Sequence, residues 1–103
     1  MSTDTSTTAI IEKQTDKIIN EPGKYKVIFL NDNITPMEFV IGLLVQIFKH
    51  TEETAKEITM QIHNTGSGCA GIYSYEIAEQ KTTEANVCSR HQGFPLVIQI
   101  EKE

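Results

Sequence analysis

The chain has 103 residues, of which 39% are hydrophobic, and its formal net charge is -5 at pH 7. This length gives room for one domain with a modest core and excludes a second domain. The acidic balance argues against binding to nucleic acid or to an anionic membrane, because both depend on clustered Lys and Arg. We therefore expect a small soluble protein that binds neither nucleic acid nor membrane.

The first 23 residues differ in composition from the rest of the chain. Residues 2–8 are all Ser, Thr or Asp, so they bury too little apolar surface to offset the entropy of ordering, and Glu21-Pro22-Gly23 marks a boundary. We expect a flexible N-terminal extension at residues 1–23 and a folded domain at residues 24–103. The extension resembles neither a signal nor a transit peptide, which together with two widely separated cysteines predicts a reduced, cytoplasmic protein.

Six segments have the periodicity of regular secondary structure. A continuous apolar run predicts a strand at residues 25–30, and an apolar stripe that widens nearly all round predicts a central helix at residues 36–48. The other expected elements are a helix from residue 52 to about residue 64, a strand at 69–73, a helix at 75–90 and a strand at 96–101. This order predicts an α+β fold, in which a three-stranded antiparallel sheet packs against three helices on one side.

Local signals refine the second and third helices. Thr51 and Ser74 can act as their N-caps, and Gly66 or Gly68 can supply the left-handed exit of the second helix. The second helix should bury Ala55, Ile58 and Ile62. The third helix is the most polar, and its thin apolar stripe is expected to be Ile77, Ala78, Ala85 and Cys88.

The start of the first helix is marked by several overlapping signals. Thr35 fits the N-cap position and Pro36 the first helical position, while Glu38 stands three residues after the cap, as in a capping box. Ile34 can pack onto Phe39 as a hydrophobic staple.

Asn31, Asp32 and Asn33 place side-chain oxygens directly before this helix, beside the apolar residues Met37 and Val40. Acceptors next to an apolar wall suit a ligand with a polar head and an apolar body. Asx residues between a strand and a helix also serve simply as turn and cap formers, and local chemistry alone favours that simpler interpretation.

Other chemistry has weaker support. His63 stands at the end of the second helix, where a histidine can serve simply as a partner of the helix dipole. By itself it is weak evidence for a binding site. Zinc is disfavoured because His50, His63, Cys69, Cys88 and His91 include no Cys-x-x-Cys or His-x-x-x-His pair, whereas zinc sites usually show paired ligands at short spacing. Cys69 falls in a strand and Cys88 on an apolar helix stripe, where thiols are normally inert. The residues therefore indicate a binding module without a metal rather than an enzyme.

Four segments stand out when they are considered together: Asn31-Asp32-Asn33-Ile34-Thr35-Pro36-Met37-Glu38-Phe39-Val40, Ile62-His63, Ser74-Tyr75-Glu76-Ile77-Ala78-Glu79-Gln80-Lys81 and Pro95-Leu96. They closely resemble the ClpS family of adaptors, which bring N-degron substrates to the Clp ATPase-protease. The resemblance spans about residues 24–102. It implies an α+β fold that is also found in the C-terminal domain of the ribosomal stalk protein.

The resemblance implies a peptide-binding site for proteins whose first residue is Leu, Phe, Tyr or Trp. Asn31, Asn33 and His63 would accept hydrogen bonds from the free α-ammonium group, which carries three donors. The first side chain would enter a pocket lined by Thr35, Met37, Val40, Thr59, Ile62 and Leu96. Met37 would act as the gate, because its flexible thioether packs against aromatic and Leu side chains but clashes with β-branched ones.

The second implied partner is the N-terminal domain of a Clp ATPase. Glu76 and Lys81 match family positions that dock on this domain, and a docking role requires both to be exposed. The extension at residues 1–23 resembles the segment that the ATPase engages during substrate transfer. The resemblance thus implies a monomeric adaptor that has no catalytic residues, no cofactor and no metal.

Two residues depart from the family pattern. Asn33 stands where the family usually has an acidic residue, so the site loses a charge-assisted hydrogen bond and affinity is expected to fall about tenfold. Thr59 stands where the family commonly has Met, which predicts a wider and more polar pocket wall with an altered preference among Leu, Phe, Tyr and Trp.

These departures leave three alternatives open. The first is a ClpS-like modulator of the ATPase with weak or altered N-degron binding. The second is an interaction domain like that of the ribosomal stalk. The third and least supported is an enzyme that uses Cys69 or Cys88 with a nearby His.

Overall fold

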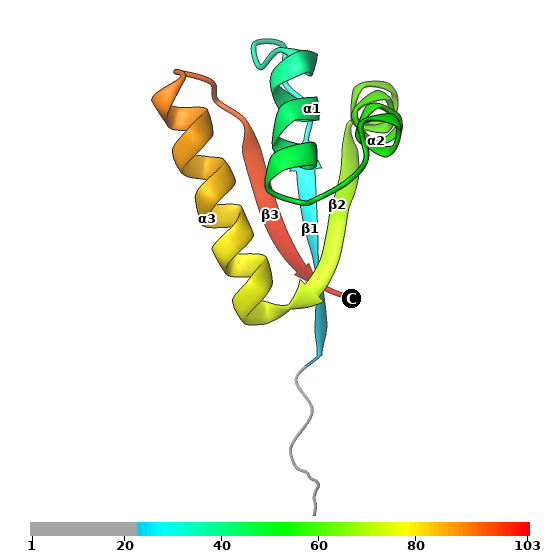
Figure 1. Cartoon of the computed structure of the whole chain (residues 1–103), viewed down its shortest axis with the longest axis vertical. Helices are drawn as coiled ribbons and strands as arrows, with labels where there is room; N and C mark the ends of the chain where they lie inside the picture. Colours follow the sequence, from blue (N-terminus) through cyan, green and yellow to red (C-terminus); the bar gives the residue numbers. More distant parts are fainter. Residues whose placement is uncertain (1–22) are drawn as a thin grey trace, which may run out of the picture.

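The computed structural model describes residues 23–103. The predicted flexible extension therefore lies almost wholly outside the described residues. The described part contains β1 (Lys24–Leu30), α1 (Met37–Gln46), α2 (Glu52–Thr65), β2 (Ser67–Ser74), α3 (Tyr75–His91) and β3 (Val97–Lys102), as Figure 1 shows. This order confirms the sequence of elements predicted from hydrophobic periodicity, and no helix among residues 23–103 is long and apolar enough to cross a membrane.

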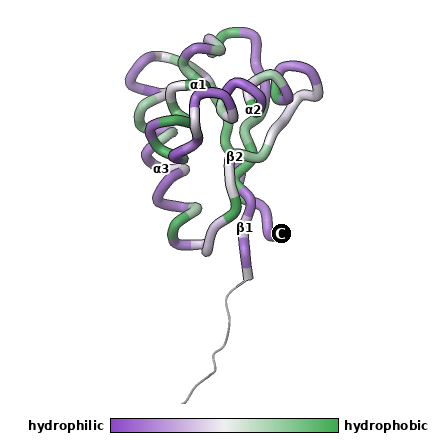
Figure 2. Tube along the Cα trace, turned by 45° about the vertical axis from the view of Figure 1, so that its right-hand side comes forward, coloured by the Kyte–Doolittle hydropathy of each residue, from purple (hydrophilic) through white to green (hydrophobic). Residues whose placement is uncertain are grey.

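The sheet has the strand order β2-β1-β3, and both outer strands run antiparallel to β1. Along β1, Val27 and Phe29 are fully buried, while the alternate residues Lys26 and Ile28 are only partly covered. This alternation follows from the period of two along a strand and gives the sheet one covered face. The three helices lie on that face (Figures 1 and 2), which confirms the predicted α+β arrangement.

The hydrophobic core lies between this face of the sheet and the helices, where Figure 2 shows the most hydrophobic segments. Leu44 of α1, Ala55 of α2 and Leu96 before β3 all bury their side chains there. Phe48, just after α1, packs edge-on against Phe29 with 5.5 Å between ring centroids. Each such buried aromatic or aliphatic side chain stabilises the fold by about 1.5–3 kcal/mol relative to an exposed one.

The start of α1 differs from the prediction. The helix begins at Met37, and Pro36 occupies the N-cap position in an extended conformation with no side-chain cap. Thr35 is not the N-cap, because its hydroxyl donates instead to a carboxylate oxygen of Asp32 (2.8 Å). The predicted capping box is therefore absent from this helix start.

The predicted hydrophobic staple is likewise wrong. Ile34 is 66% exposed, and the ring of Phe39 packs edge-on against Phe94, with centroids 4.9 Å apart. Phe94 lies in the connection between α3 and β3, so this aromatic pair joins the start of α1 to that connection. Sequence periodicity alone does not reveal such a distant partner.

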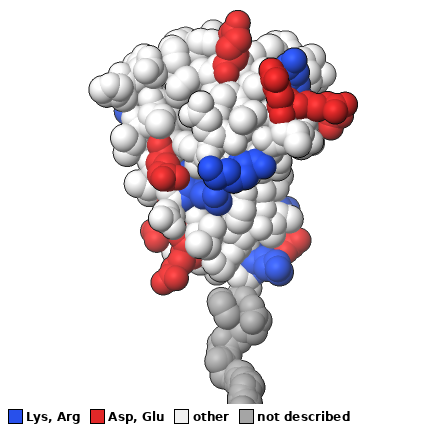
Figure 3. Space-filling view, in the orientation of Figure 1, with Lys and Arg blue, Asp and Glu red and all other residues white. Residues whose placement is uncertain are grey.

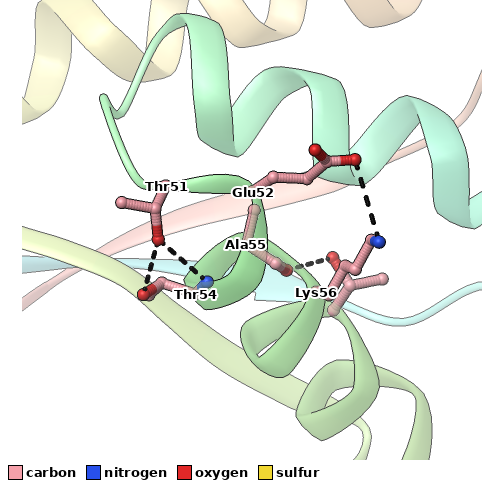
Figure 4. A network of polar contacts seen from close by, with 6 residues as sticks. Thr51, Glu52, Thr54, Ala55 and Lys56 are labelled. Atoms are coloured by element: carbon pink, nitrogen blue, oxygen red, sulfur yellow. Dashed lines mark hydrogen bonds and ion pairs between the residues drawn. The ribbon is translucent and has the colours of Figure 1, made fainter.

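The caps of α2 agree with the prediction. The Thr51 side chain accepts a hydrogen bond from the backbone N–H of Thr54 (3.1 Å), and Glu52 and Lys56 form an exposed ion pair at 3.8 Å (Figure 4). At the other end, Gly66 adopts the left-handed conformation with φ of 95°. This backbone conformation is readily available to glycine, so Gly66 ends the helix as expected.

The buried face of α3 differs from the predicted stripe. Ala78, Thr82, Ala85 and Ser89 are buried, whereas Ile77 and Cys88 are exposed. Small side chains at these four positions let the helix backbone lie close to all three strands. Ser74 occupies the predicted N-cap position, but its side chain makes no capping hydrogen bond.

Candidate functional site

The candidate site lies at the end of the domain where β1 stops and α1 starts. The backbone N–H of Asn31 donates to the carbonyl of Gly66 (2.9 Å), which joins the end of β1 to the end of α2. The segment before β3 reaches the same end of the sheet, because β3 runs antiparallel to β1 and Val97 pairs with Leu30. Three segments that are distant in sequence are therefore brought together here (Figure 1).

Asp32 organises the turn between β1 and α1. One carboxylate oxygen accepts hydrogen bonds from the N–H groups of Ile34 (2.8 Å) and Thr35 (2.7 Å), and the other accepts the Thr35 hydroxyl (2.8 Å). Partial burial acts to raise the pKa of Asp32, but these three hydrogen bonds outweigh burial and hold the pKa below its usual value of 3.8. The charged carboxylate thus fixes the turn and has little accepting capacity left for a ligand.

The residues on either side of Asp32 are placed differently. Asn31 and Asn33 are exposed, and within residues 23–103 neither side chain makes a hydrogen bond. Their amide oxygens are therefore available to an external donor. His63 is also exposed and lies in the last turn of α2, one turn before the Gly66 carbonyl that accepts from Asn31.

A small cavity opens beside this turn. Its volume is about 20 Å³, and its lining residues are Leu30, Asn31, Asp32, Thr35, Val40, Ile62 and Leu96. The structure therefore brings together five of the residues that the resemblance places in the site: Asn31, Thr35, Val40, Ile62 and Leu96. Leu30 and Asp32 line the cavity as well and were not predicted to do so. Both are neighbours of Asn31 in the sequence, and this was the feature from which their place in the cavity wall could have been predicted.

The remaining predicted residues do not line this cavity. Met37 is 38% exposed and Asn33 and His63 are exposed, so these three lie outside the closed space. Thr59 is 3% exposed, and its hydroxyl donates to the carbonyl of Ala55 (2.8 Å). Ala55 is labelled in Figure 4. The Thr59 hydroxyl is thus satisfied within α2, and the wider pocket expected from this residue is not seen in the present conformation.

Larger hollows occur elsewhere on the surface, and polar side chains such as Glu38 and Gln46 contribute to their linings. The groove between α1 and α3 has a volume of about 410 Å³, and Cys88 and His91 contribute to its lining. Both cysteines are free, and residues 23–103 contain no group of three side chains suited to bind a metal ion. The small cavity combines the apolar walls of Val40, Ile62 and Leu96 with the polar turn that Asp32 fixes, so we take it as the candidate site.

The two predicted docking residues differ in their surroundings. Glu76 lies exposed in the first turn of α3. Lys81 is only half-exposed, contrary to the expectation, because its ammonium donates to the carbonyl of Ile47 (2.8 Å) and lies over the rings of Tyr73 and Phe48 at 5.4 and 6.0 Å. A cation at the C-terminal end of α1 also compensates the helix dipole. Lys81 is therefore engaged within the domain.

Comparisons with known proteins agree with the geometry. The family model described as ATP-dependent Clp protease adaptor protein ClpS matches residues 20–99. A protein of Helicobacter hepaticus named ATP-dependent Clp protease adapter protein ClpS is 40% identical over 91 residues, which cover 88% of this chain and 92% of that protein. A protein of the same name from Bdellovibrio bacteriovorus is 44% identical over 85 residues, covering 82% of this chain and 75% of that protein.

A solved structure gives the same answer for the fold. Agrobacterium tumefaciens ClpS2 bound to L-phenylalaninamide matches with a TM-score of 0.78 and 38% sequence identity, over 81% of this chain and 100% of that chain. Its ligand combines a free α-amino group with a bulky apolar side chain.

Proposed function

The chain belongs to the ClpS family of ATP-dependent Clp protease adaptor proteins, and we propose that it binds proteins whose first residue is Leu, Phe, Tyr or Trp and delivers them to the Clp ATPase-protease. The observation that carries this proposal is the turn fixed by Asp32, which leaves the Asn31 amide free at the lining of an apolar cavity and the Asn33 amide exposed on the same turn.

The proposed recognition divides the ligand into two parts. The α-ammonium group donates to the side chains of Asn31, Asn33 and His63, which lie at the end of β1, in the turn and at the end of α2. The first side chain enters between Val40 and the other apolar residues of the cavity. Because an ammonium group requires acceptors on several sides, a blocked N-terminus should not bind.

Two further residues set the proposed preference. Met37 lies half-exposed beside the cavity, and its flexible side chain gates the entrance. Thr59 is buried on the same face of α2 as Ile62 and forms the deeper wall. The hydroxyl hydrogen of Thr59 is already donated to the Ala55 carbonyl, so we expect Thr59 to offer the incoming residue its methyl group and no hydrogen-bond donor.

We further propose that the N-terminal domain of the Clp ATPase is the second partner. This domain contacts α3 around Glu76 and Lys81. In this proposal the protein acts as a monomer in the cytoplasm, has no cofactor and carries out no catalysis itself. Two free thiols, Cys69 and Cys88, are compatible with a reducing compartment.

Fluorescence polarisation with labelled peptides tests the proposed recognition. Peptides that start with Leu, Phe, Tyr or Trp should bind, whereas peptides that start with Val, and a Phe peptide with an acetylated N-terminus, should not. Asn31→Ala should lose most of the affinity, because it removes an acceptor for the ammonium group. Equal binding of the free and acetylated Phe peptides would contradict the proposal.

A second candidate function has support from the cavity itself. A space of about 20 Å³ beside the neutral residue Asn33 also suits a ClpS-like modulator that docks on the ATPase without binding N-degrons. This modulator would bind the ATPase and leave every peptide of the series unbound. The peptide titration therefore separates the two functions.

A further inference from the structure

The sheet has a second face, which the helices do not cover. All three helices pack on one face, so within residues 23–103 the other face is open (Figure 1). Along β1, Lys26, Ile28 and Leu30 alternate with the buried Val27 and Phe29 and therefore belong to this open face. Residues directly opposite one another on paired strands share a face, so the strand register extends the open face onto β2 and β3.

This open face is more apolar than a face that only meets water. Five of its nine positions carry an apolar side chain or a thiol, and the exposed fractions of Ile72 and Val97 are 44% and 45%. The water-facing side of an antiparallel sheet usually carries polar residues instead. A contiguous exposed apolar patch of this kind indicates an interaction surface. Its three rows across β2, β1 and β3 are Ile72, Lys26 and Glu101; Cys69, Ile28 and Gln99; and Ser67, Leu30 and Val97.

The size of the open face limits what can cover it. Three strands are about 14 Å wide, and the five residues from Lys26 to Leu30 are about 17 Å long, which gives an area of roughly 240 Å². A stable interface between separate chains buries about 800 Å² on each partner. This face alone is therefore too small to hold a second copy of the chain. A segment of the same chain needs much less contact, because its tether gives it an effective concentration of about a millimolar.

The chain enters β1 at the edge of this face. The N–H of Glu103 donates to the Lys24 carbonyl (2.9 Å), and a Cβ atom placed on Gly23 would lie 3.2 Å from Cε of Lys102. Residues 20–23 read Asn-Glu-Pro-Gly, and Pro-Gly is typical of a chain reversal. Four residues span up to about 14 Å, which exceeds the distance of about 10 Å between packed layers. Residues before position 20 can therefore reach the open face.

The sequence of residues 10–19 fits this face. It reads Ile-Ile-Glu-Lys-Gln-Thr-Asp-Lys-Ile-Ile. At about 100° per residue, the four isoleucines share one half of a helix with Gln14 and Thr15, and all four charged residues fall on the other half. The two isoleucine pairs are eight positions apart, which is about 12 Å along a helix. The first and third rows of the open face are about 13 Å apart.

We propose that residues 10–19 bind the open face of the sheet as an amphipathic helix. Ile18 and Ile19 lie towards Ile72 in the first row, and Ile10 and Ile11 lie towards Val97 in the third row. The sheet is then covered on both faces. The proposal does not depend on N-degron binding, because the candidate site is lined from α1 and α2 on the side of the sheet where the helices pack.

Nuclear magnetic resonance of the full chain provides the first test. Amide correlation spectra compare the original protein with a variant that carries Ile10→Ser, Ile11→Ser, Ile18→Ser and Ile19→Ser. The amide signals of Ile28, Ile72 and Val97 should shift, because the variant loses the apolar contact with the sheet. The signals of Gly42 and Val87, which line the groove between α1 and α3, should not shift.

The matched control carries Lys13→Ser and Lys17→Ser, which change only the charged half of the segment and should leave the sheet signals in place. Three outcomes would overturn the proposal. The first is an absence of shifts in the sheet. The second is a set of shifts at Gly42 and Val87 in their place, which would assign the segment to the groove. The third is a set of shifts that depends on protein concentration, which would assign the face to a second copy.

Disulfide formation provides the second test. A chain with Cys69→Ser and Cys88→Ser receives new thiols through Ile18→Cys and Ile72→Cys, and a glutathione buffer measures the effective concentration of one thiol at the other. This value should be at least about tenfold higher than in the same chain with Ile10→Ser, Ile11→Ser and Ile19→Ser, because the remaining isoleucines hold the segment on the sheet. Equal values in the two chains would mean that the tether alone brings the thiols together, and the proposal would be wrong.

Discussion

The side chain at position 33 decides whether the proposed binding site for the α-ammonium group contains a negative charge. Asn and Asp have the same shape, but only Asp carries a charge. Asn33 offers a neutral acceptor where the family pattern expects an acid, and the nearby Asp32 carboxylate is occupied by its own turn. A charge-assisted hydrogen bond contributes about 1.5–3 kcal/mol and a neutral one about 1 kcal/mol. The substitution Asn33→Asp should therefore increase affinity for a Phe-initiated peptide by about tenfold.

Fluorescence polarisation at constant ionic strength measures this change, and Asn33→Ala is the matched control. The alanine variant should bind more weakly than the original protein because it has no acceptor. If Asp, Asn and Ala at position 33 bind equally, residue 33 does not contact the ammonium group.

Asp32 acts on stability rather than on the ligand directly. Asp32→Ala removes all three hydrogen bonds of the turn and should lower the free energy of unfolding by about 1–2 kcal/mol at neutral pH. Asp32→Asn should cost less, because an amide oxygen can still accept from the two backbone N–H groups. Urea denaturation of the three proteins measures this order.

The lowered pKa of Asp32 also predicts how these differences change with pH. The group has a lower pKa in the folded state than the unfolded value of 3.8, so its stabilising effect is complete above that value and is lost as the pH falls through the folded-state pKa. The difference between the original protein and Asp32→Asn should thus be constant from neutral pH to about pH 5 and shrink below pH 3.8. A constant difference down to pH 2 would contradict this role.

Thr82 is the one buried side chain among the described residues whose polar atom has no hydrogen-bond partner. An unpaired buried hydroxyl costs about 1–3 kcal/mol, so the isosteric change Thr82→Val should raise the free energy of unfolding by about 1 kcal/mol. Ser89, on the same buried face of α3, donates to the Ala85 carbonyl (2.8 Å) and is the control. Ser89→Ala should bring no comparable gain in a urea titration.

At the scale of elements, one glycine inside a helix and one at the end of a helix have opposite effects on stability when each is replaced by alanine. Gly42 lies inside α1 with a free space around it, so Gly42→Ala should stabilise the protein by about 0.5–1 kcal/mol through helix propensity. Gly66 ends α2 in the left-handed conformation, and Gly66→Ala should cost about 1 kcal/mol because a Cβ atom disfavours φ of 95°. Thermal unfolding compares the two variants, and a change of the same sign in both would contradict this account.

The ends of the helices were predicted correctly where only residues close in sequence determine them. Thr51 and Gly66 cap α2 as predicted, since a cap depends on residues a few positions away. The start of α1 was wrong because Asp32 competes for Thr35. The face of α3 was misjudged for a different reason: contact with the sheet favours small residues such as Ala78 and Ser89 over the more hydrophobic Ile77.

The candidate site was predicted in the same uneven way. The family motif identified Asn31, Val40 and Leu96, which meet at one cavity although they come from separate segments. The motif did not predict that the cavity would be closed, because closure depends on how α1 packs. It also did not predict that Lys81 would be bonded to the Ile47 carbonyl, because that contact joins residues 34 positions apart.

At the scale of the whole molecule, the two proposed surfaces lie at opposite ends of the sheet. The pocket adjoins Leu30 at the end of β1, whereas α3 begins directly after Ser74, which pairs with Lys24 at the start of β1. The six residue-to-residue steps from Lys24 to Leu30 correspond to about 20 Å along the strand. Figure 3 shows acidic side chains grouped at the lower end of α3. An adaptor with this geometry can hold a substrate at one end while the other end contacts the ATPase.

This separation predicts that docking and peptide binding can be changed independently. Glu76→Lys reverses a charge in the first turn of α3 and should weaken binding to the isolated N-terminal domain of the Clp ATPase by at least about tenfold, since like charges at an interface are costly. Affinity for a Phe-initiated peptide should not change, because the pocket is at the far end of the sheet. Glu79→Lys makes the same change in net charge on the same helix and should have a smaller effect on docking. Equal losses from both variants in a calorimetric titration would mean that the interface responds to overall charge, and that Glu76 has no specific place in it.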